Sequence, residues 1–369
     1  MNRRQMLKSG AVAAAVPFAE AAPAAKSSPS SKKIAFVLGC QSGPTDDKRL
    51  QFFKRHSVNH ISGYADDPEK KGYFSVEDVS RVRERCEKQG ITLMMIEPGF
   101  LASSHIDKTA RPAIMIGKSP ERDRDIECVQ KTIQSCAKAG VPGIKYNMSL
   151  LGVLRTERTP GRGGSTYSTW RLQEAKASSK FSPETKAGPV NADAYWERIT
   201  YFLDRVIPVA NEYKVRMACH PHDPGVPPVE GFQKIDTVLG TPDGLKKFVS
   251  IQESPYHGLN FCQGTVSEML QNPGKEIFDV IRYFGSRKKI FNVHFRNIRG
   301  KRDNFQEVYP DEGDIDFVEA VKVYREVGYP YMLMPDHVPH HPDDPKGDQA
   351  FAFAYGYIRA LIQAADRMA

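Results

Sequence analysis

Several features that mark common protein classes are missing from this sequence of 369 residues. It has no stretch long and apolar enough to span a membrane. It also has no block of lysine and arginine with interleaved aromatic residues, which would indicate nucleic-acid binding. Its six cysteines form no Cys-x-x-Cys pair, so zinc-finger and thioredoxin-like proteins are not indicated. No Gly-x-Gly-x-x-Gly motif follows the first predicted strand, which argues against a dinucleotide-binding fold.

The bulk composition suits one large folded domain. Hydrophobic residues make up 40% of the chain, which is enough for a substantial core. The net charge of +8 is a mild excess that is compatible with attracting small anions. A chain of this size does not need a disulfide framework. Most cysteines are therefore expected to be small buried side chains, with the exception of Cys262, which ends a predicted strand.

The N-terminus has the three parts of an export signal. Arg3 and Arg4 lead a basic segment, an Ala-rich weakly apolar stretch follows, and Ala22-Pro23-Ala24 offers a small-residue cleavage site. We therefore expect a twin-arginine signal peptide over residues 1–25 and a linker over 26–32, rich in Ser, Lys and Pro. The mature protein is then expected in the periplasm or otherwise exported, with no membrane segment left.

From residue 33 onward, short β-type runs alternate with longer helical patterns. Several runs are continuously apolar, as expected for strands buried on both faces. Repeats of strand and helix predict a parallel sheet, and their number and the chain length favour a single (β/α)8 TIM barrel over 33–369, with long loops at its C-terminal face. An open doubly wound sheet is the alternative. The predicted strands are Ile34–Leu38, Val58–Ile61, Ile91–Ile96, Gly143–Tyr146, Val215–Cys219, Gly258–Phe261, Ile290–His294 and Tyr331–Met334.

Residues 155–190 interrupt this rhythm. The segment contains Thr-Pro-Gly-Arg-Gly-Gly-Ser and then a polar stretch. A connection this long without regular structure is usually functional or mobile. We interpret it as a loop inserted over the mouth of the barrel.

Polar side chains end the last four predicted strands. His220, Cys262, His294 and Asp336 stand at or just after these ends. A single histidine at a strand end is more often a hydrogen-bonded core residue, but the ends of parallel barrel strands share one rim. Two imidazoles, a thiolate and a carboxylate together predict a divalent metal site. The donor set alone leaves zinc, iron and manganese open.

Other polar residues near these ends are candidates for substrate contact or proton transfer. His337 follows Asp336 and suits proton transfer near neutral pH, although a surface or metal-supporting histidine would have the same position. Guanidinium groups match carboxylates in geometry, which makes two arginines candidate clamps for an acid. The predicted substrate-binding residues are Tyr146, Asn147, Arg155, His222 and Arg296.

The segments around these residues resemble the mannonate dehydratase family, a branch of the xylose-isomerase-like TIM barrels. The resemblance extends roughly from Ile91 to the C-terminus, in motifs whose order and spacing are specific. These motifs are Lys145-Tyr146-Asn147 with Arg155-Thr156, Cys219-His220-Pro221-His222-Asp223-Pro224, Gly258-Leu259-Asn260-Phe261-Cys262-Gln263-Gly264, Val293-His294-Phe295-Arg296-Asn297, Glu312-Gly313-Asp314-Ile315-Asp316, Pro335-Asp336-His337 and Tyr357-Ile358-Arg359-Ala360-Leu361.

The resemblance implies a function. It implies that the four strand-end residues bind Mn(II) or Fe(II), that His337 does acid/base work, and that D-mannonate loses water to give 2-keto-3-deoxy-D-gluconate. Two alternatives stay open at this point: a sugar isomerase or epimerase on the same barrel, and an exported sugar-acid binding protein without turnover. The expected partner is a small sugar acid and not nucleic acid, and assembly into a homo-oligomer is compatible with the sequence.

The sequence also departs from the family pattern. The Trp-Tyr-Gly-type opening segment is not present around Phe36–Gly43. The Pro-Gly-Tyr that the family carries before its last helix is replaced by residues 343–348, which contain no Tyr, and Val338 stands where the family has Gly. These differences leave the predicted metal ligands in place and alter part of the expected substrate and acid/base groups.

Overall fold

The computed structural model describes residues 35–181, 185–226 and 231–367. The predicted signal peptide and linker lie outside the described residues. Within the described part of the chain, no helix combines the length and apolar character that crossing a membrane requires.

Eight parallel strands close into a barrel, in the order β1-β12-β9-β8-β7-β4-β3-β2. This confirms the predicted (β/α)8 fold and excludes the open sheet, because β1 pairs with both β2 and β12. Each of the eight predicted strands has a counterpart. The barrel strands are β1 (Val37–Cys40), β2 (His60–Gly63), β3 (Thr92–Ile96), β4 (Gly143–Asn147), β7 (Arg216–His220), β8 (His257–Cys262), β9 (Ile290–His294) and β12 (Met332–Met334).

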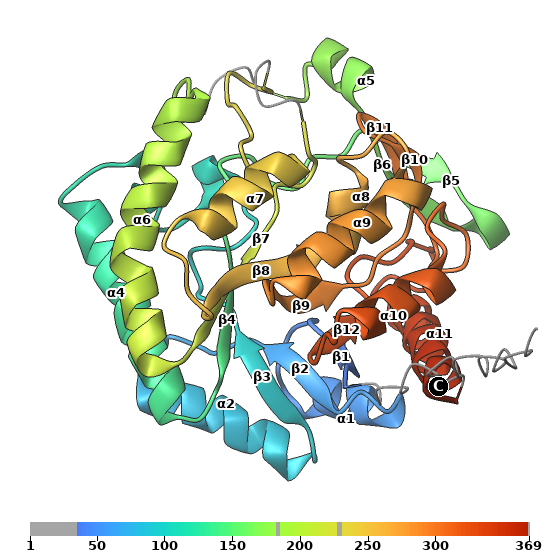
Figure 1. Cartoon of the computed structure of the whole chain (residues 1–369), viewed down its shortest axis with the longest axis horizontal. Helices are drawn as coiled ribbons and strands as arrows, with labels where there is room; N and C mark the ends of the chain where they lie inside the picture. Colours follow the sequence, from blue (N-terminus) through green and yellow to red (C-terminus); the bar gives the residue numbers. More distant parts are fainter. Residues whose placement is uncertain (1–34, 182–184, 227–230, 368–369) are drawn as a thin grey trace, which may run out of the picture. The chain divides into compact units, whose positions relative to one another are not determined.

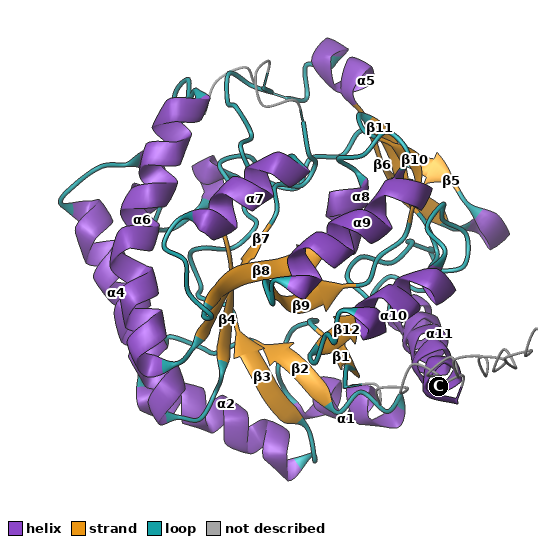
Figure 2. Cartoon of the chain, viewed as in Figure 1, coloured by secondary structure: helices purple, strands orange, loops and turns teal. Residues whose placement is uncertain are grey.

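Helices surround the barrel on its outside (Figures 1 and 2). They form where capping residues precede amphipathic segments. Ser75, for example, makes a capping box with Asp78 at the start of the second helix, which buries Val79, Val82 and Cys86 at helical spacing. The main helices are α1 (Asp47–Arg55), α2 (Val76–Lys88), α4 (Glu121–Lys138), α6 (Ala192–Tyr213), α7 (Pro242–Ser250), α9 (Pro273–Ser286), α10 (Phe317–Glu326) and α11 (Asp348–Arg367).

Residues 155–190 contain regular structure, so the prediction of a loop without it is wrong. They contain β5 (Thr159–Pro160), β6 (Thr166–Arg171) and α5 (Leu172–Ala177). The two strands join β10 (Ile298–Lys301) and β11 (Asn304–Glu307) in an antiparallel sheet of order β10-β11-β6-β5, which we call the small sheet (Figure 1).

Packing and pairing explain why the small sheet forms. Trp170 of β6 is fully buried and makes edge contacts with Phe181 and Phe232, with ring centroids 6.0 and 5.4 Å apart. The backbone of Thr166 also exchanges hydrogen bonds of 2.8 and 3.0 Å with His340, which lies beyond the last barrel strand. The small sheet is therefore tied to the chain segment that follows β12.

Candidate metal centre and active site

The side chains of His220, Cys262, His294 and Asp336 converge at one end of the barrel. One ligand atom from each lies within 4.8 Å of the others. His220, Cys262 and His294 are the last residues of β7, β8 and β9, and Asp336 comes two residues after β12. Cys262 is the register partner of His294, so their side chains point to the same side of the sheet. The convergence predicted from the strand ends is therefore present.

The hydrogen bonds of both histidines suit metal ligation. Nδ1 of His220 lies 2.7 Å from the carbonyl oxygen of Pro221, which leaves Nε2 for the cluster. In His294 the roles are reversed: Nε2 lies 3.2 Å from the side chains of Asn260 and Gln41. Its buried Nδ1 has no hydrogen-bond partner among the described residues and faces Oδ1 of Asp336 at 3.3 Å. One nitrogen held by an outer partner and the other turned inward is the usual arrangement of metal-binding histidines.

The charges of the cluster also fit a cation. Burial lowers the pKa of His220 well below its usual range, so the imidazole is neutral, as a ligand must be. Burial opposes ionisation of Asp336, but His294 and His337 outweigh it and hold the pKa of this carboxyl well below its usual range. Burial raises the pKa of the Cys262 thiol. A thiolate at this position therefore requires a nearby positive charge, which a divalent ion would supply.

His337 lies beside the cluster and is more open to solvent. Its side chain is 37% exposed, compared with 16% for Asp336 and 2% for His294. Nδ1 lies 2.9 and 3.0 Å from the two carboxylate oxygens of Glu307, the last residue of β11. Burial lowers the pKa of His337, but Asp336 and Glu307 outweigh that effect, so the pKa lies above its usual value.

Arg155 and Arg296 are engaged by carboxylates of the protein itself. Nη1 of Arg155 lies 2.7 Å from Asp223, and Nη2 of Arg296 lies 2.7 Å from Glu268. Both arginines also contact Glu307, with Nη1 of Arg296 at 2.6 Å. This largely buried set of five residues is the ion cluster. It argues against the predicted role of the two arginines as substrate clamps, because their guanidinium groups already have carboxylate partners.

Two further predicted substrate residues point away from the metal centre. Tyr146 is fully buried and packs on Phe202 of α6, with ring centroids 5.6 Å apart. His222 uses both ring nitrogens within the protein: Nε2 lies 2.9 Å from the carbonyl oxygen of Met148, and Nδ1 accepts from the backbone N–H of Leu239 at 3.3 Å. These placements argue against substrate contact by Tyr146 and His222.

Asn147 does lie beside the centre. It is the register partner of His220 in the neighbouring strand, so the two side chains share a face of the sheet. Its buried Nδ2 has no hydrogen-bond partner among the described residues. The prediction of substrate contact by Asn147 stays open and is compatible with this geometry.

Sequence reasoning missed two groups of buried polar residues near the centre. Lys145 forms a 2.7 Å ion pair with Glu97, which directly follows β3. Glu268 and Glu307 hold the arginines of the ion cluster. The position of Glu97 after an apolar run was a usable signal, whereas Glu307 ends a strand of the small sheet that the sequence analysis did not predict.

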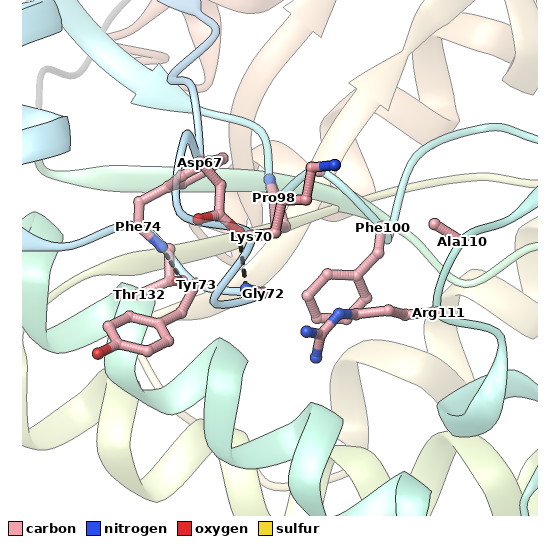
Figure 3. A pocket seen from close by; sticks show the side chains of 11 residues that line it. Asp67, Lys70, Gly72, Tyr73, Phe74, Pro98, Phe100, Ala110, Arg111 and Thr132 are labelled. Carbon is pink, nitrogen blue, oxygen red and sulfur yellow. Dashed lines mark hydrogen bonds between the residues drawn. The ribbon is translucent and has the colours of Figure 1, made fainter.

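A separate surface pocket lies beside the barrel. Its volume is about 320 Å³, and Phe74, Pro98 and Phe100 form its apolar wall (Figure 3). The carboxylate of Asp67 accepts hydrogen bonds from backbone N–H groups of the pocket's own loop, and Arg111 pairs with Asp125 at 3.0 Å. The four candidate metal ligands do not line this pocket.

The geometry defines a class: a TIM-barrel enzyme with a candidate divalent metal site of two nitrogens, one sulfur and one oxygen at the barrel mouth. Comparison with known proteins then gives the family. Residues 180–369 match the family model described as D-mannonate dehydratase (UxuA). The chain belongs to the mannonate dehydratase family, as the motif resemblance predicted, and is accordingly a hydro-lyase.

Individual relatives agree with this assignment. The mannonate dehydratase of Thermotoga maritima is 30% identical over 71% of this chain and 77% of its own length. Mannonate dehydratase 2 of Halalkalibacterium halodurans is 27% identical over 80% of this chain and 88% of its own. The fold is shared with the crystal structure of mannonate dehydratase from Streptococcus suis, which has a TM-score of 0.72 at 22% identity and covers 91% of this chain and 94% of that one.

Sugar epimerases share the fold more distantly. The structure of L-ribulose 3-epimerase has a TM-score of 0.52 at 15% identity, covering 90% of this chain and 96% of that chain. Likeness at this level shows the fold alone. The isomerase or epimerase alternative is therefore not better supported than the dehydratase.

Two buried cysteines on neighbouring strands allow a matched test of the metal centre. We expect Cys262→Ala to lose most of the bound divalent metal, because the substitution removes one of four proposed ligands. We expect Cys219→Ala to keep the metal, because Cys219 and its register partner Tyr146 face the opposite side of the sheet. Elemental analysis of both purified proteins measures the difference. Equal metal content in the two variants would remove Cys262 from the ligand set.

Proposed function

We propose that this chain is a metal-dependent dehydratase that converts D-mannonate to 2-keto-3-deoxy-D-gluconate and water. The observation that carries the proposal is the buried four-donor cluster with His337 at its side. The named activity of the relatives supports the choice of D-mannonate as substrate.

The proposed ligands are His220, Cys262, His294 and Asp336, and the proposed ion is Mn(II) or Fe(II). Imidazole and thiolate suit iron, and a carboxylate in an open site also admits manganese. When bound, a divalent ion stabilises the negative charge that develops beside the carboxylate as the proton on C2 is lost.

The protein side chains then have to move protons and exclude water. Loss of the C2 proton leaves an electron pair that forms the C2–C3 double bond, the C3–O bond breaks, and the departing hydroxide takes a proton to become water. The resulting enol becomes the keto product. We assign proton transfer to Nε2 of His337, because Nδ1 is held by Glu307 and the side chain is the most exposed of the centre.

Arg155 and Arg296 act on this step through Glu307, and Arg296 also contacts His337 directly, with Nη1 2.6 Å from Nδ1. Both contact Glu307, so their charges keep it ionised: burial alone would raise its pKa, but Arg155 and Arg296 lower the pKa to about 2. An ionised Glu307 fixes the orientation of the imidazole ring and favours the Nδ1–H tautomer. The proposed role of the ion cluster is therefore positioning, and substrate contact passes to Asn147.

Product analysis tests the proposed function directly. Protein loaded with Mn(II) or Fe(II) is incubated with a panel of aldonic acids, and the products are identified. We expect a 2-keto-3-deoxy acid from D-mannonate. An isomeric sugar acid would show an isomerase or epimerase instead, and binding without conversion would show a sugar-acid binding protein.

We expect His337→Ala to keep its metal and to lose turnover by at least about 100-fold, because it removes the proton-transfer group. His341→Ala is the matched control, since His341 lies on the same loop and contacts Gly163. Metal content and steady-state rates with D-mannonate are measured for both. Full turnover by His337→Ala would exclude it from the reaction.

We also propose that the protein is exported by the twin-arginine route, on the basis of residues 1–25 alone. We expect replacement of Arg3 and Arg4 by lysine to retain the full-length precursor inside the cell. Cell fractionation with antibody detection compares this variant with the wild type. Equal distribution of the two proteins between fractions would contradict the proposal.

A further inference from the structure

A second group of polar side chains lies across the barrel mouth from the metal ligands. It comes from the ends of β1, β3 and β4, whereas the ligands come from β7, β8, β9 and β12. Nζ of Lys145 lies 2.7 Å from Oε1 of Glu97, and their side chains are 5% and 9% exposed. Exposure is similar for the metal ligands, at 2% for His294 and 16% for Asp336. Both groups are therefore largely withdrawn from solvent.

Strand register places this group next to the metal centre. Ile96 pairs with Ile144, so the following residues Glu97 and Lys145 lie at one level. Asn147, two residues further along β4, lies at the level of His220. Lys145 and Asn147 share a face of the strand because side chains alternate.

Gln41 connects the two groups. Its Oε1 lies 3.2 Å from Nε2 of His294, and its Nε2 lies 3.4 Å from Oε2 of Glu97. A chain of polar contacts therefore runs from a metal ligand to the Lys145–Glu97 ion pair.

Burying the Lys145–Glu97 ion pair lowers the free energy of unfolding unless further hydrogen bonds compensate. Barrel interiors are usually filled by branched apolar side chains, and taking two charges out of water costs several kcal/mol per ion unless other hydrogen bonds compensate. The ammonium of Lys145 has three N–H donors, and among the described residues its one hydrogen-bond partner is Glu97. Nδ2 of Asn147 is buried with no partner there. N–H donors of Lys145 and Asn147 therefore remain available to bind a ligand.

We propose that Lys145, Glu97 and Asn147 form a subsite that binds the hydroxyl groups of the sugar acid that lie away from its carboxylate. The inference rests on the proposed function and specifies its substrate class. A hydroxyl group can donate to Glu97 and accept from Lys145 or Asn147 at the same time. A carboxylate cannot do this, because it would face the negative charge of Glu97. The subsite therefore selects polyhydroxy acids over short hydroxy acids.

Binding measurements in a non-reacting background test this subsite. Every protein carries His337→Ala, so that D-mannonate is bound without being consumed, and is loaded with Mn(II). Isothermal titration calorimetry measures the dissociation constants of D-mannonate and of glycolate, which has the same α-hydroxy acid group and no further hydroxyls. We expect Lys145→Met to weaken D-mannonate binding by at least about tenfold, as loss of hydrogen bonds to a charged group requires. Glycolate binding stays unchanged.

Lys289→Met is the matched control. Lys289 is also a buried lysine, precedes β9, and pairs with Glu253 and the backbone of Ser254, while the metal ligands stand at the opposite end of the barrel strands. We expect both dissociation constants to be unchanged. Glu97→Gln, which keeps the side-chain size, tests the same selectivity if Lys145→Met does not fold. It too should weaken D-mannonate binding and leave glycolate binding unchanged.

The outcomes separate this subsite from the proposed function. Unchanged D-mannonate binding in Lys145→Met or Glu97→Gln would overturn the subsite, as would equal weakening for both acids. Product analysis of the wild type tests the dehydratase reaction independently of these binding measurements. A wild type that forms no keto-deoxy acid, while the variants still lose selectivity for D-mannonate, would overturn the dehydratase proposal and leave the subsite.

Discussion

The constraint on which the site depends is that all eight parallel strands end at one rim. Four of them bring a nitrogen, a sulfur, a nitrogen and an oxygen to within 4.8 Å of one another in a largely buried space. Without a cation, burial favours the protonated thiol of Cys262, whereas His294 and His337 keep the neighbouring Asp336 ionised. A divalent ion reconciles these charges, because it stabilises the thiolate and the carboxylate together. The charges of the four side chains are thus compatible with a bound divalent metal.

A second level of organisation is built from segments outside the barrel strands. The small sheet carries Glu307 to the barrel mouth, and the ion cluster keeps that carboxylate charged among buried neighbours. His337 is held by this carboxylate and by Arg296, whose Nη1 lies 2.6 Å from Nδ1 of His337. The positions of the candidate metal ligands therefore depend on strand register, whereas the orientation of His337 depends on the packing of the small sheet.

Sequence reasoning succeeded where one local pattern sufficed. Apolar runs ending in His220, Cys262, His294 and Asp336 predict both the barrel and the meeting of these side chains, since the fold aligns the strand ends. Sequence reasoning could not decide which face of a strand each side chain occupies, because neighbouring residues point to opposite faces. Tyr146 faces outward to Phe202, while Lys145 and Asn147 share the inward face. Sequence reasoning also could not identify the carboxylate partners of Arg155, because these residues are distant in sequence. Glu307, for example, lies 152 residues after Arg155.

The backbone pairing of Thr166 with His340 has a consequence for how such enzymes can diversify. Residues 155–190, the hairpin of β10 and β11, and the segment after β12 share hydrogen bonds within one antiparallel assembly. Replacing any one of them alone would expose unpaired strand edges, which favour aggregation. Recombination between relatives therefore has to exchange all three segments together, while the barrel beneath can stay the same.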